Sequence, residues 1–441
     1  MDTRIVIVGG GLTGALAAVR LHEAGHDVSV HERRDDLRRS TEHEGRSINL
    51  AFSTRGLDAL DRVGLSRALR EHAIPMRGRM LHGRDGSVTF QPYSADPANV
   101  LLSVSRDGLN AMLLDAVDER RISTHFGHRL VDIELRSSNA VFETSDTRLR
   151  EHFDVMIGAD GAYSAVRNRL QRTDRFSYEQ NYLEHGYKEL TIPVRADGSF
   201  AMEPHALHIW PRGGHMMIAL PNMDGSFTCT LFWPFGGPVG FERVDTECEV
   251  TETFLEQFPD AVELMPHLAD EYLRNSTSSL VTIRCGPWFY EDRVVLLGDA
   301  AHAVVPFYGQ GANAALEDVT IFMDQLAAND GAWGPTMASF YAQRKPDTDA
   351  LADLALDNFV EMRDRVASPL FRLRVRAEQR MHRWVPRWIT PLYEMVTFSR
   401  TPYVEAVARA KHQTALVERL LLALVAVIFL VVVAIIVFVV V

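Results

Sequence analysis

The chain has 441 residues, of which 46% are hydrophobic, so it can form two or three globular units around a large buried core. Its formal net charge of -12 argues against nucleic acid as a partner. Cys229, Cys248 and Cys285 are widely spaced and form no CxxC pair, which argues against a metal site, a disulfide framework and a dithiol redox centre.

The N-terminus predicts a nucleotide-binding unit. Residues 4–8 are apolar without alternation, as in a strand buried on both faces, and a helical pattern follows from Ala15 to Ala24. The glycines of a GxGxxG fingerprint lie between the two, at Gly9, Gly11 and Gly14. They allow a tight turn, close approach of a pyrophosphate and close helix–strand packing. Glu32 closes the next predicted strand, residues 28–30, and would receive the ribose hydroxyls of FAD or NAD.

A second strand and turn carry an Asp-Gly pair. The apolar run at residues 155–157 leads into Gly158-Ala159-Asp160-Gly161, and a helix follows whose first turn holds Ser164. By itself, this pair is equally typical of an ordinary turn. Its meaning depends on the other nucleotide-binding segments.

The third segment has the reverse order, Gly-Asp. The strand predicted at residues 293–297 leads into Gly298-Asp299, then an irregular stretch, then a helix that opens near Ala312-Asn313. Asp299 can accept hydrogen bonds from a ribose or ribityl chain, and the amides at the helix start supply the positive end of a dipole. This pattern favours a nucleotide with a redox-active ring.

Between the second and third segments, alternating aromatic-rich runs predict an antiparallel sheet with short turns, at residues 206–210, 216–220 and 227–232. After the third segment the pattern is helical from Ala332 to Arg400. We expect breaks at its prolines, Pro346, Pro369, Pro386 and Pro391.

Two C-terminal segments suggest contact with lipid. Residues 371–388 combine 6 arginines with two tryptophans, which fits either a membrane-surface helix or the solvated face of a packed helix. Residues 420–441 carry no polar or charged side chain, and as a helix of about 33 Å they would cross a bilayer core of about 30 Å. We therefore expect a transmembrane tail anchor. Arg409, Lys411 and Arg419 before it favour a catalytic body on the cytoplasmic side.

The order of these segments resembles the flavoprotein aromatic hydroxylases typified by para-hydroxybenzoate hydroxylase. Further blocks resemble the kynurenine 3-monooxygenase family. They are residues 45–51 (GRSINLA), 74–80 (IPMRGRM), 102–106 (LSVSR), 185–193 (HGYKELTIP), 207–212 (LHIWPR) and 391–400 (PLYEMVTFSR). The resemblance implies an enzyme that uses FAD, NADPH and dioxygen to hydroxylate L-kynurenine to 3-hydroxy-L-kynurenine. That reaction would belong to tryptophan degradation toward quinolinate and NAD synthesis.

The expected fold class is α/β: a Rossmann-like FAD-binding domain, an inserted antiparallel β substrate domain, C-terminal helices and a C-terminal transmembrane helix. Because the nucleotide motifs are far apart in sequence, the FAD-binding domain would be discontinuous, at residues 1–75, 100–180 and 285–330. The other expected parts are the substrate domain at 76–99 and 181–284, a helical region at 331–419 and the membrane anchor at 420–441. The membrane would be cytoplasmic in a bacterium and the mitochondrial outer membrane in a eukaryote.

The resemblance also implies roles for single residues. FAD would be contacted by Gly9, Gly11, Thr13, Gly14, Glu32, Arg34, Ala51, Arg106, Leu130, Asp160, Asp299, Ala312 and Asn313. Pro306, Gly311 and Asn313 would lie against the flavin ring as catalytic residues, where helix amides stabilise the anionic reduced ring. The substrate would be held by Arg79, Tyr93, Asn358 and Tyr393, with the guanidinium matching the amino-acid carboxylate.

A general base is less necessary than with a phenol, because an aniline amine activates its own ortho carbon, and none of the 17 histidines is a clear candidate. His302 is therefore interpreted as a packing histidine. Ala312 and Tyr308 depart from the family pattern, which often has Met and Phe there, and they bear on coupling and substrate breadth. The competing readings are a flavin halogenase, whose W-x-W-x-I-P motif this chain lacks, a reductase of membrane isoprenoids, and a flavin-binding scaffold without turnover.

Overall fold

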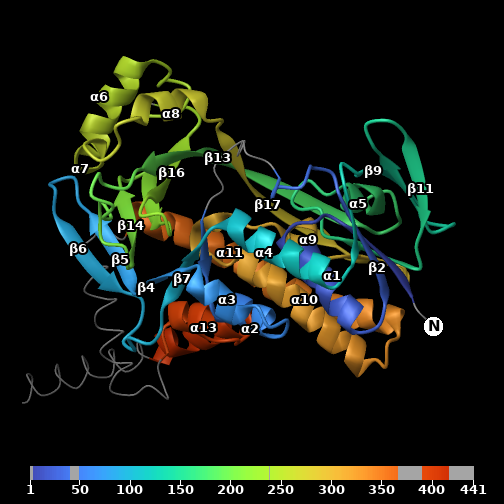
Figure 1. Cartoon of the computed structure of the whole chain (residues 1–441). Helices are drawn as coiled ribbons and strands as arrows, with labels where there is room; N and C mark the ends of the chain where they lie inside the picture. Colours follow the sequence, from blue (N-terminus) through green and yellow to red (C-terminus); the bar gives the residue numbers. More distant parts are fainter. Residues whose placement is uncertain (1–2, 40–48, 238, 366–389, 417–441) are drawn as a thin grey trace, which may run out of the picture.

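The computed structural model describes residues 3–39, 49–237, 239–365 and 390–416. Figure 1 shows two units side by side. One carries helices α1 (Leu12–Glu23), α4 (Arg106–Glu119) and α10 (Gly311–Ala328), and the other carries helices α6 (Glu247–Gln257), α7 (Pro259–Val262) and α8 (Leu268–Arg274) at its far end.

A six-stranded sheet forms the nucleotide-binding unit, in the order β18-β19-β12-β1-β2-β8. Its strands are β1 (Arg4–Val8), β2 (Asp27–Glu32), β8 (Ser123–Phe126), β12 (Val155–Gly158), β18 (Phe289–Tyr290) and β19 (Val294–Leu296). Neighbouring strands are parallel except at the β18 edge. Val8 lies opposite both Gly158 and His31, so the predicted nucleotide motifs meet where the parallel strands end. Helix α1 packs against α4 and α10 beside this sheet.

Two three-stranded sheets and three short helices complete this unit. One sheet is antiparallel, with β9 (Arg129–Glu134), β10 (Asn139–Glu143) and β11 (Arg148–His152), and the other has the order β3 (Leu50–Phe52), β7 (Leu101–Val104), β4 (Ile74–Met76). The helices are α2 (Thr54–Asp61), α3 (Ser66–Glu71) and α5 (Ala165–Leu170). Ser164 caps α5 by accepting a hydrogen bond from Arg167 N at 2.9 Å, and so lies one residue before the helix.

A seven-stranded sheet forms the second unit, in the order β17-β13-β16-β15-β14-β5-β6. Its strands are β5 (Gly78–His82), β6 (Val88–Pro92), β13 (Ser177–Ile192), β14 (Ala206–Pro211), β15 (Met216–Pro221), β16 (Phe227–Pro234) and β17 (Ser278–Gly286). The three alternating runs form antiparallel neighbours, as predicted. Strands β13 and β17 run across the boundaries predicted at residues 180 and 284, so continuous strands join the two units.

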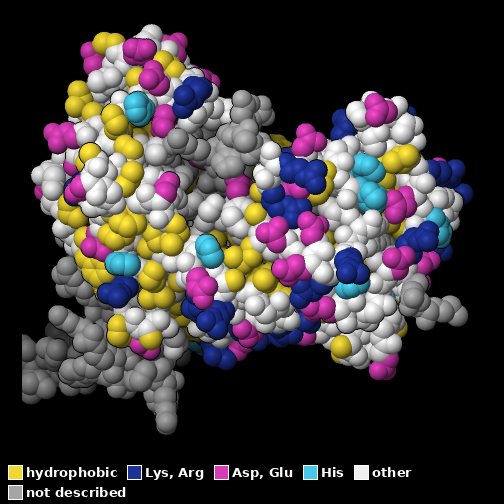
Figure 2. All heavy atoms as spheres, in the orientation of Figure 1, with side chains coloured by type: hydrophobic (Ala, Val, Ile, Leu, Met, Phe, Trp, Pro, Cys, Tyr) yellow, Lys and Arg dark blue, Asp and Glu magenta, His cyan; other side chains and the backbone are white. Residues whose placement is uncertain are grey.

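Helices α6 to α8 cover one side of this sheet around Trp233, Phe254 and Tyr272. Figure 2 shows hydrophobic side chains gathered over the seven-stranded sheet, whereas basic and acidic side chains alternate over the nucleotide-binding unit. Val88 and Phe90 on the edge strand β6 are among the exposed apolar residues.

Within the described residues, the chain after β19 is mainly helical. It contains α9 (Asp299–His302), the 3-10 turn η1 (Pro306–Tyr308), α10, α11 (Trp333–Val360), the π-helical turn η2 (Glu361–Arg365) and α13 (Leu392–Phe398). The break expected at Pro346 is wrong, because α11 continues through it. An interior proline costs a helix about 3 kcal/mol. Arg344 and Asp347 on either side of it are buried and paired at 2.6 Å, and this pairing helps to hold the helix intact.

Pro391 precedes α13, as predicted, whereas Pro369, Pro386 and the arginine-rich segment 371–388 lie outside the described residues. The predicted fold class is corrected at its C-terminal end. Across the described parts of the chain, no helix is long and apolar enough to cross a bilayer, and residues 420–441 lie outside them. Helix α11 has the required length but carries charged side chains such as Arg344, Lys345 and Asp347.

Candidate active site

The fold brings the three nucleotide-binding segments into contact. A Cβ atom added to Gly9, whose φ is +107°, would lie 2.4 Å from the carbonyl oxygen of Ala159, next to Asp160. A Cβ added to Gly298 would lie 2.7 Å from Thr13 Oγ1. The fingerprint loop therefore touches both aspartate loops, although these segments are far apart in sequence.

The fingerprint glycines form a cradle that fits a pyrophosphate. A Cβ at Gly14 would lie 1.9 Å from the carbonyl oxygen of Gly9, so only glycine allows α1 to pack this closely on the turn. A Cβ at Gly11, in contrast, would meet no atom within 4 Å, which leaves the backbone open for a ligand. Helix α1 begins there without a side-chain cap, so its first amides can bind an anion.

The three predicted acids differ in the hydrogen bonds that their carboxylates accept from the protein. Glu32 is oriented at the end of β2 by Gly10 N at 2.8 Å and Arg34 N at 3.0 Å. Asp299 is half-buried, and no hydrogen bond to its carboxylate is found among the described residues. Asp160 instead accepts from Ser164 Oγ at 2.5 Å and Ala165 N at 2.7 Å, and so caps α5. Burial raises the pKa of Asp160, and the hydrogen bonds oppose that effect.

The remaining predicted cofactor residues lie around this cradle. Leu130 on β9 is buried in the core of the nucleotide-binding unit. Arg34 lies two residues after Glu32, and its carbonyl accepts from Gly127 N at 3.1 Å. Arg106 is exposed at the start of α4. Glu32 could receive the adenosine ribose, the open backbone at Gly11 the pyrophosphate, and Asp299, unpaired among the described residues, the ribityl chain. Together these groups fit FAD.

Helix α10 begins beside η1, and its first turn has no side-chain cap. Asn313, which is 1% exposed, accepts from Ser53 N at 2.9 Å and donates to the carbonyls of Ala51 and Gly309 at 3.0 and 2.8 Å. Its side chain therefore joins α10 to β3 and the preceding loop. The backbone amides at Gly311 and Ala312 remain the groups that can face a flavin. Pro306 is exposed at the start of this loop.

A buried arginine and two tyrosines form the second half of the site. The guanidinium carbon of Arg79 on β5 lies 4.8 Å from the ring centre of Tyr393 and 5.7 Å from that of Tyr93, and the two rings stack at 5.5 Å. Arg79 is 8% exposed and Tyr93 5%. Arg79 Nε and the Tyr93 hydroxyl have no hydrogen-bond partner in the described structure. Buried donors without partners are costly, so this pair is suited to receive an anionic ligand.

The charge states match that role. Burial raises the pKa of Tyr93 and of Tyr393, so both hydroxyls are protonated donors at neutral pH. Burial alone would lower the pKa of Arg79, but Tyr393, Tyr93 and Glu361 raise it overall. The guanidinium therefore stays charged. Glu361 is a site neighbour that sequence reasoning missed.

An apolar wall connects the Arg79 site to the loop around η1, which precedes α10 and which we call the flavin loop. Leu207 on β14 and Ile218 on β15 pack against the buried cluster that contains Tyr93 and also against the one that contains Phe307. Sequence reasoning did not single them out. Both lie half-buried in otherwise buried strands, and this exposure is not visible in the sequence, so no sequence signal could have identified them.

Two other residues have mainly positional contacts. The Asn358 amide donates to the Phe307 carbonyl at 2.6 Å and so joins α11 to the loop, which leaves only its oxygen for a ligand. His302 Nε2 lies 2.5 Å from Asp318 Oδ2, and both residues are buried. His302 is thus committed to an ion network, in agreement with its interpretation as a packing residue.

This fold and site define a flavoprotein of the aromatic-hydroxylase type. A family model described as "FAD binding domain" matches residues 2–353. Among solved structures, 2-methyl-3-hydroxypyridine-5-carboxylic acid oxygenase is similar with a TM-score of 0.68 and 20% identity, covering 83% of this chain and 94% of that one. PqsL from Pseudomonas aeruginosa, solved with 2-aminobenzoylacetate, has a TM-score of 0.66 and 21% identity, covering 83% and 98%. At these identities the likeness shows the fold alone.

Sequence relatives are much more similar. Kynurenine 3-monooxygenase of Flavobacterium psychrophilum is 43% identical over 95% of this chain and 93% of its own length. Those of Myxococcus xanthus and Dictyostelium discoideum are 44% and 43% identical, covering 90% and 92% of this chain and 86% and 90% of their own. The chain belongs to the kynurenine 3-monooxygenase family.

Proposed function

We propose that this protein uses FAD, NADPH and dioxygen to hydroxylate L-kynurenine to 3-hydroxy-L-kynurenine. The observation that carries the proposal is the buried Arg79, whose Nε and neighbouring Tyr93 hydroxyl lack partners within the described residues. They lie at one end of an apolar wall that leads to the flavin loop. The names of the relatives support the same substrate.

The residues would divide the work as follows. Arg79 would bind the amino-acid carboxylate through its guanidinium fork, and Tyr93 and Tyr393 would add hydroxyl donors. Leu207 and Ile218 would hold the aromatic ring and exclude water. Bound FAD would supply reduction by NADPH and activation of dioxygen for transfer of one oxygen atom.

The protein has no need to remove a proton before attack, because the ring amine already makes the ortho carbon electron-rich. The amides at the start of α10 would stabilise negative charge on the reduced ring. The main task left to the chain is to keep water away from the reacting atoms.

The test is NADPH oxidation by purified FAD-loaded protein with and without L-kynurenine, measuring 3-hydroxykynurenine and hydrogen peroxide together. Product in a one-to-one ratio with NADPH is expected. Stimulated oxidation that yields only peroxide would make kynurenine an effector and contradict the proposal, as would the absence of any stimulation. Running the same assay with NADH determines which nicotinamide cofactor is preferred.

A further inference from the structure

The N-terminal turn of α10 is held from outside the cofactor unit. Gln310, the residue before this helix, is 2% exposed, and its side-chain oxygen accepts from Ser53 Oγ at 3.3 Å and from the Tyr403 hydroxyl at 3.2 Å. Tyr403 belongs to the C-terminal segment, residues 391–406. A residue 93 positions away therefore contacts the start of the helix whose amides face the flavin site.

Tyr403 is itself fixed by an arginine. The Arg55 guanidinium carbon lies 4.0 Å from the centre of the Tyr403 ring, and Arg55 also donates to the carbonyls of Val396 and Thr401. Tyr403 is fully buried, and burial raises its pKa, so the hydroxyl is a permanent donor. Three contacts of one cation thus hold the C-terminal segment against α2.

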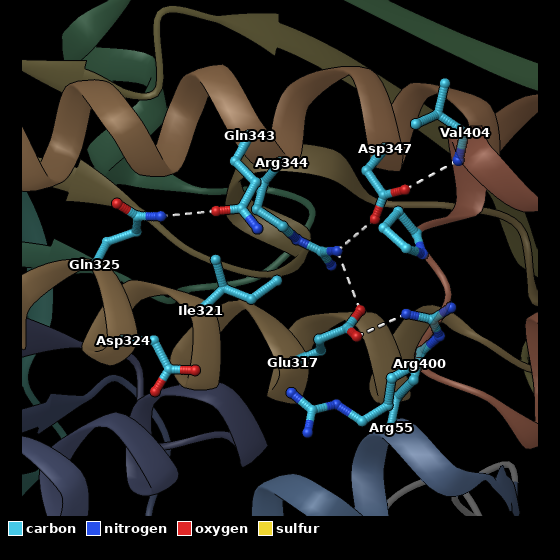
Figure 3. Close-up of a pocket in the computed structure, with 11 residues that line it drawn as sticks. Arg55, Glu317, Ile321, Asp324, Gln325, Gln343, Arg344, Asp347, Arg400 and Val404 are labelled. Atoms are coloured by element: carbon cyan, nitrogen blue, oxygen red, sulfur yellow. Dashed lines mark hydrogen bonds and ion pairs between the residues drawn. The ribbon is translucent and has the colours of Figure 1, made fainter. Parts of the chain in front are cut away.

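A second arginine, Arg344, connects the same segment to the Gly298-Asp299 loop. Figure 3 shows Arg344 between Glu317 and Asp347, with Asp347 accepting from Val404 N at 3.0 Å. Arg344 also pairs with Asp318 at 2.8 Å, and Asp318 accepts from Gly298 N at 2.9 Å. The network therefore links the C-terminal segment to the Gly-Asp loop as well as to Gln310.

The cavity of about 540 Å³ beside this network lies among these ion pairs, with Arg400, Pro402 and Val404 on one side. Arg55, Arg344, Glu317 and Asp347 at its floor are paired with each other or with the backbone. None is left to bind a ligand, so the cavity is not a second site.

The C-terminal segment also reaches the Arg79 site. It begins with α13, and Tyr393 on that helix lies 4.8 Å from the Arg79 guanidinium. One stretch of chain therefore contacts the substrate end and the flavin end of the site at once.

We propose that Tyr403 is a positioning residue, which fixes Gln310 and through it the first turn of α10, so that the flavin site is complete only when the C-terminal segment is docked. This inference rests on the proposed function only for its turnover readout. The affinity for FAD reports on the flavin site independently of the substrate.

The experiment compares Tyr403→Phe with a matched control, Tyr272→Phe, in the full FAD-loaded chain. Y403F keeps the buried ring over Arg55 and removes one hydrogen bond. Tyr272 is similarly buried, but its hydroxyl has no partner in the described structure. Y403F should weaken FAD binding about fivefold, as expected for one buried hydrogen bond, and raise the peroxide-to-product ratio. The KM for kynurenine should change less than twofold, and Y272F should change none of these.

Gln310→Met provides the second arm. If the two side chains act through their shared bond, adding Y403F to Q310M should weaken FAD binding no further. The proposal is overturned if Y403F leaves FAD affinity at the wild-type value, even when its melting temperature falls, or if the two changes are additive. If Y403F fails to fold, the Q310M variant decides alone. Unchanged FAD affinity in Q310M overturns the proposal, and weakened affinity supports it. Weakened FAD binding without any hydroxylated product would support the positioning role while the proposed function fails.

Discussion

Replacing Arg79 tests how the substrate is recognised. The guanidinium is buried with one donor unpaired in the described structure, so a substrate carboxylate there would be desolvated and would depend on it. Removing one partner of such a pair costs about 2–4 kcal/mol. Arg79→Met should therefore raise the KM for L-kynurenine roughly 30- to 1,000-fold, at about 1.4 kcal/mol for each factor of ten. FAD content should stay normal.

The assay is initial-rate NADPH oxidation with product quantified, on FAD-loaded protein. The matched control is Arg77→Met, because Arg77 is exposed two residues earlier. A kynurenine analogue whose carboxylate is replaced by hydrogen should be a poor substrate for the wild type and equally poor for R79M. The reasoning is refuted if R79M leaves the KM unchanged, or if R79M still distinguishes kynurenine from this analogue.

Three further predictions test the cofactor cradle, the acid sensitivity and the buried ion network. Gly14→Ala should lower the flavin-to-protein ratio of the purified enzyme at least tenfold, since the new Cβ would lie 1.9 Å from the carbonyl of Gly9; normal flavin content would contradict the packing argument. Burial lowers the pKa of His208 and His215 to about 4, so below about 6.5 the unfolded chain binds protons that the folded chain excludes. Stability should thus be full above pH 6.5 and fall toward pH 4, by about 2 kcal/mol per histidine between pH 7 and pH 5. His215→Phe should remove its share of that loss in urea unfolding at the two pH values. Arg344→Met should cost about 3–5 kcal/mol of unfolding free energy, because it leaves three buried carboxylates short of a partner, whereas an exposed arginine such as Arg77 should cost almost nothing.

The cofactor half of the site was predictable from sequence because its signals are local. Gly14 is required by its contact with the carbonyl of Gly9, and Gly9 has a positive φ in the same turn. Glu32 ends β2, and Asp299 follows shortly after the apolar strand β19. The parallel order of β1, β2 and β12 then places these groups at one edge. Spacing and strand ends carried that part of the prediction.

The substrate half could not be read in this way. Arg79 and Tyr393 meet across most of the chain, and no spacing rule joins them; only the resemblance to a family did so. Asn358 was predicted with them, yet its amide is committed to the Phe307 carbonyl. Pro346 was misread because local propensity predicts a break, whereas Arg344 forms long-range ion pairs that favour the continuous helix.

Strand β13, 16 residues long, has consequences for how this protein can change. Its first half pairs with β17 beside the cofactor unit, where the Arg167 guanidinium of α5 lies 5.1 Å from the Tyr178 ring and Cys285 of β17 packs in the cofactor core. Its second half pairs with β16 inside the substrate sheet, so both units contact one continuous strand. A recombinant exchange of the whole sheet between relatives would have to cut inside a paired strand. New substrates are therefore more readily reached by replacing side chains of the apolar wall, such as Leu207 and Ile218, than by exchanging whole units.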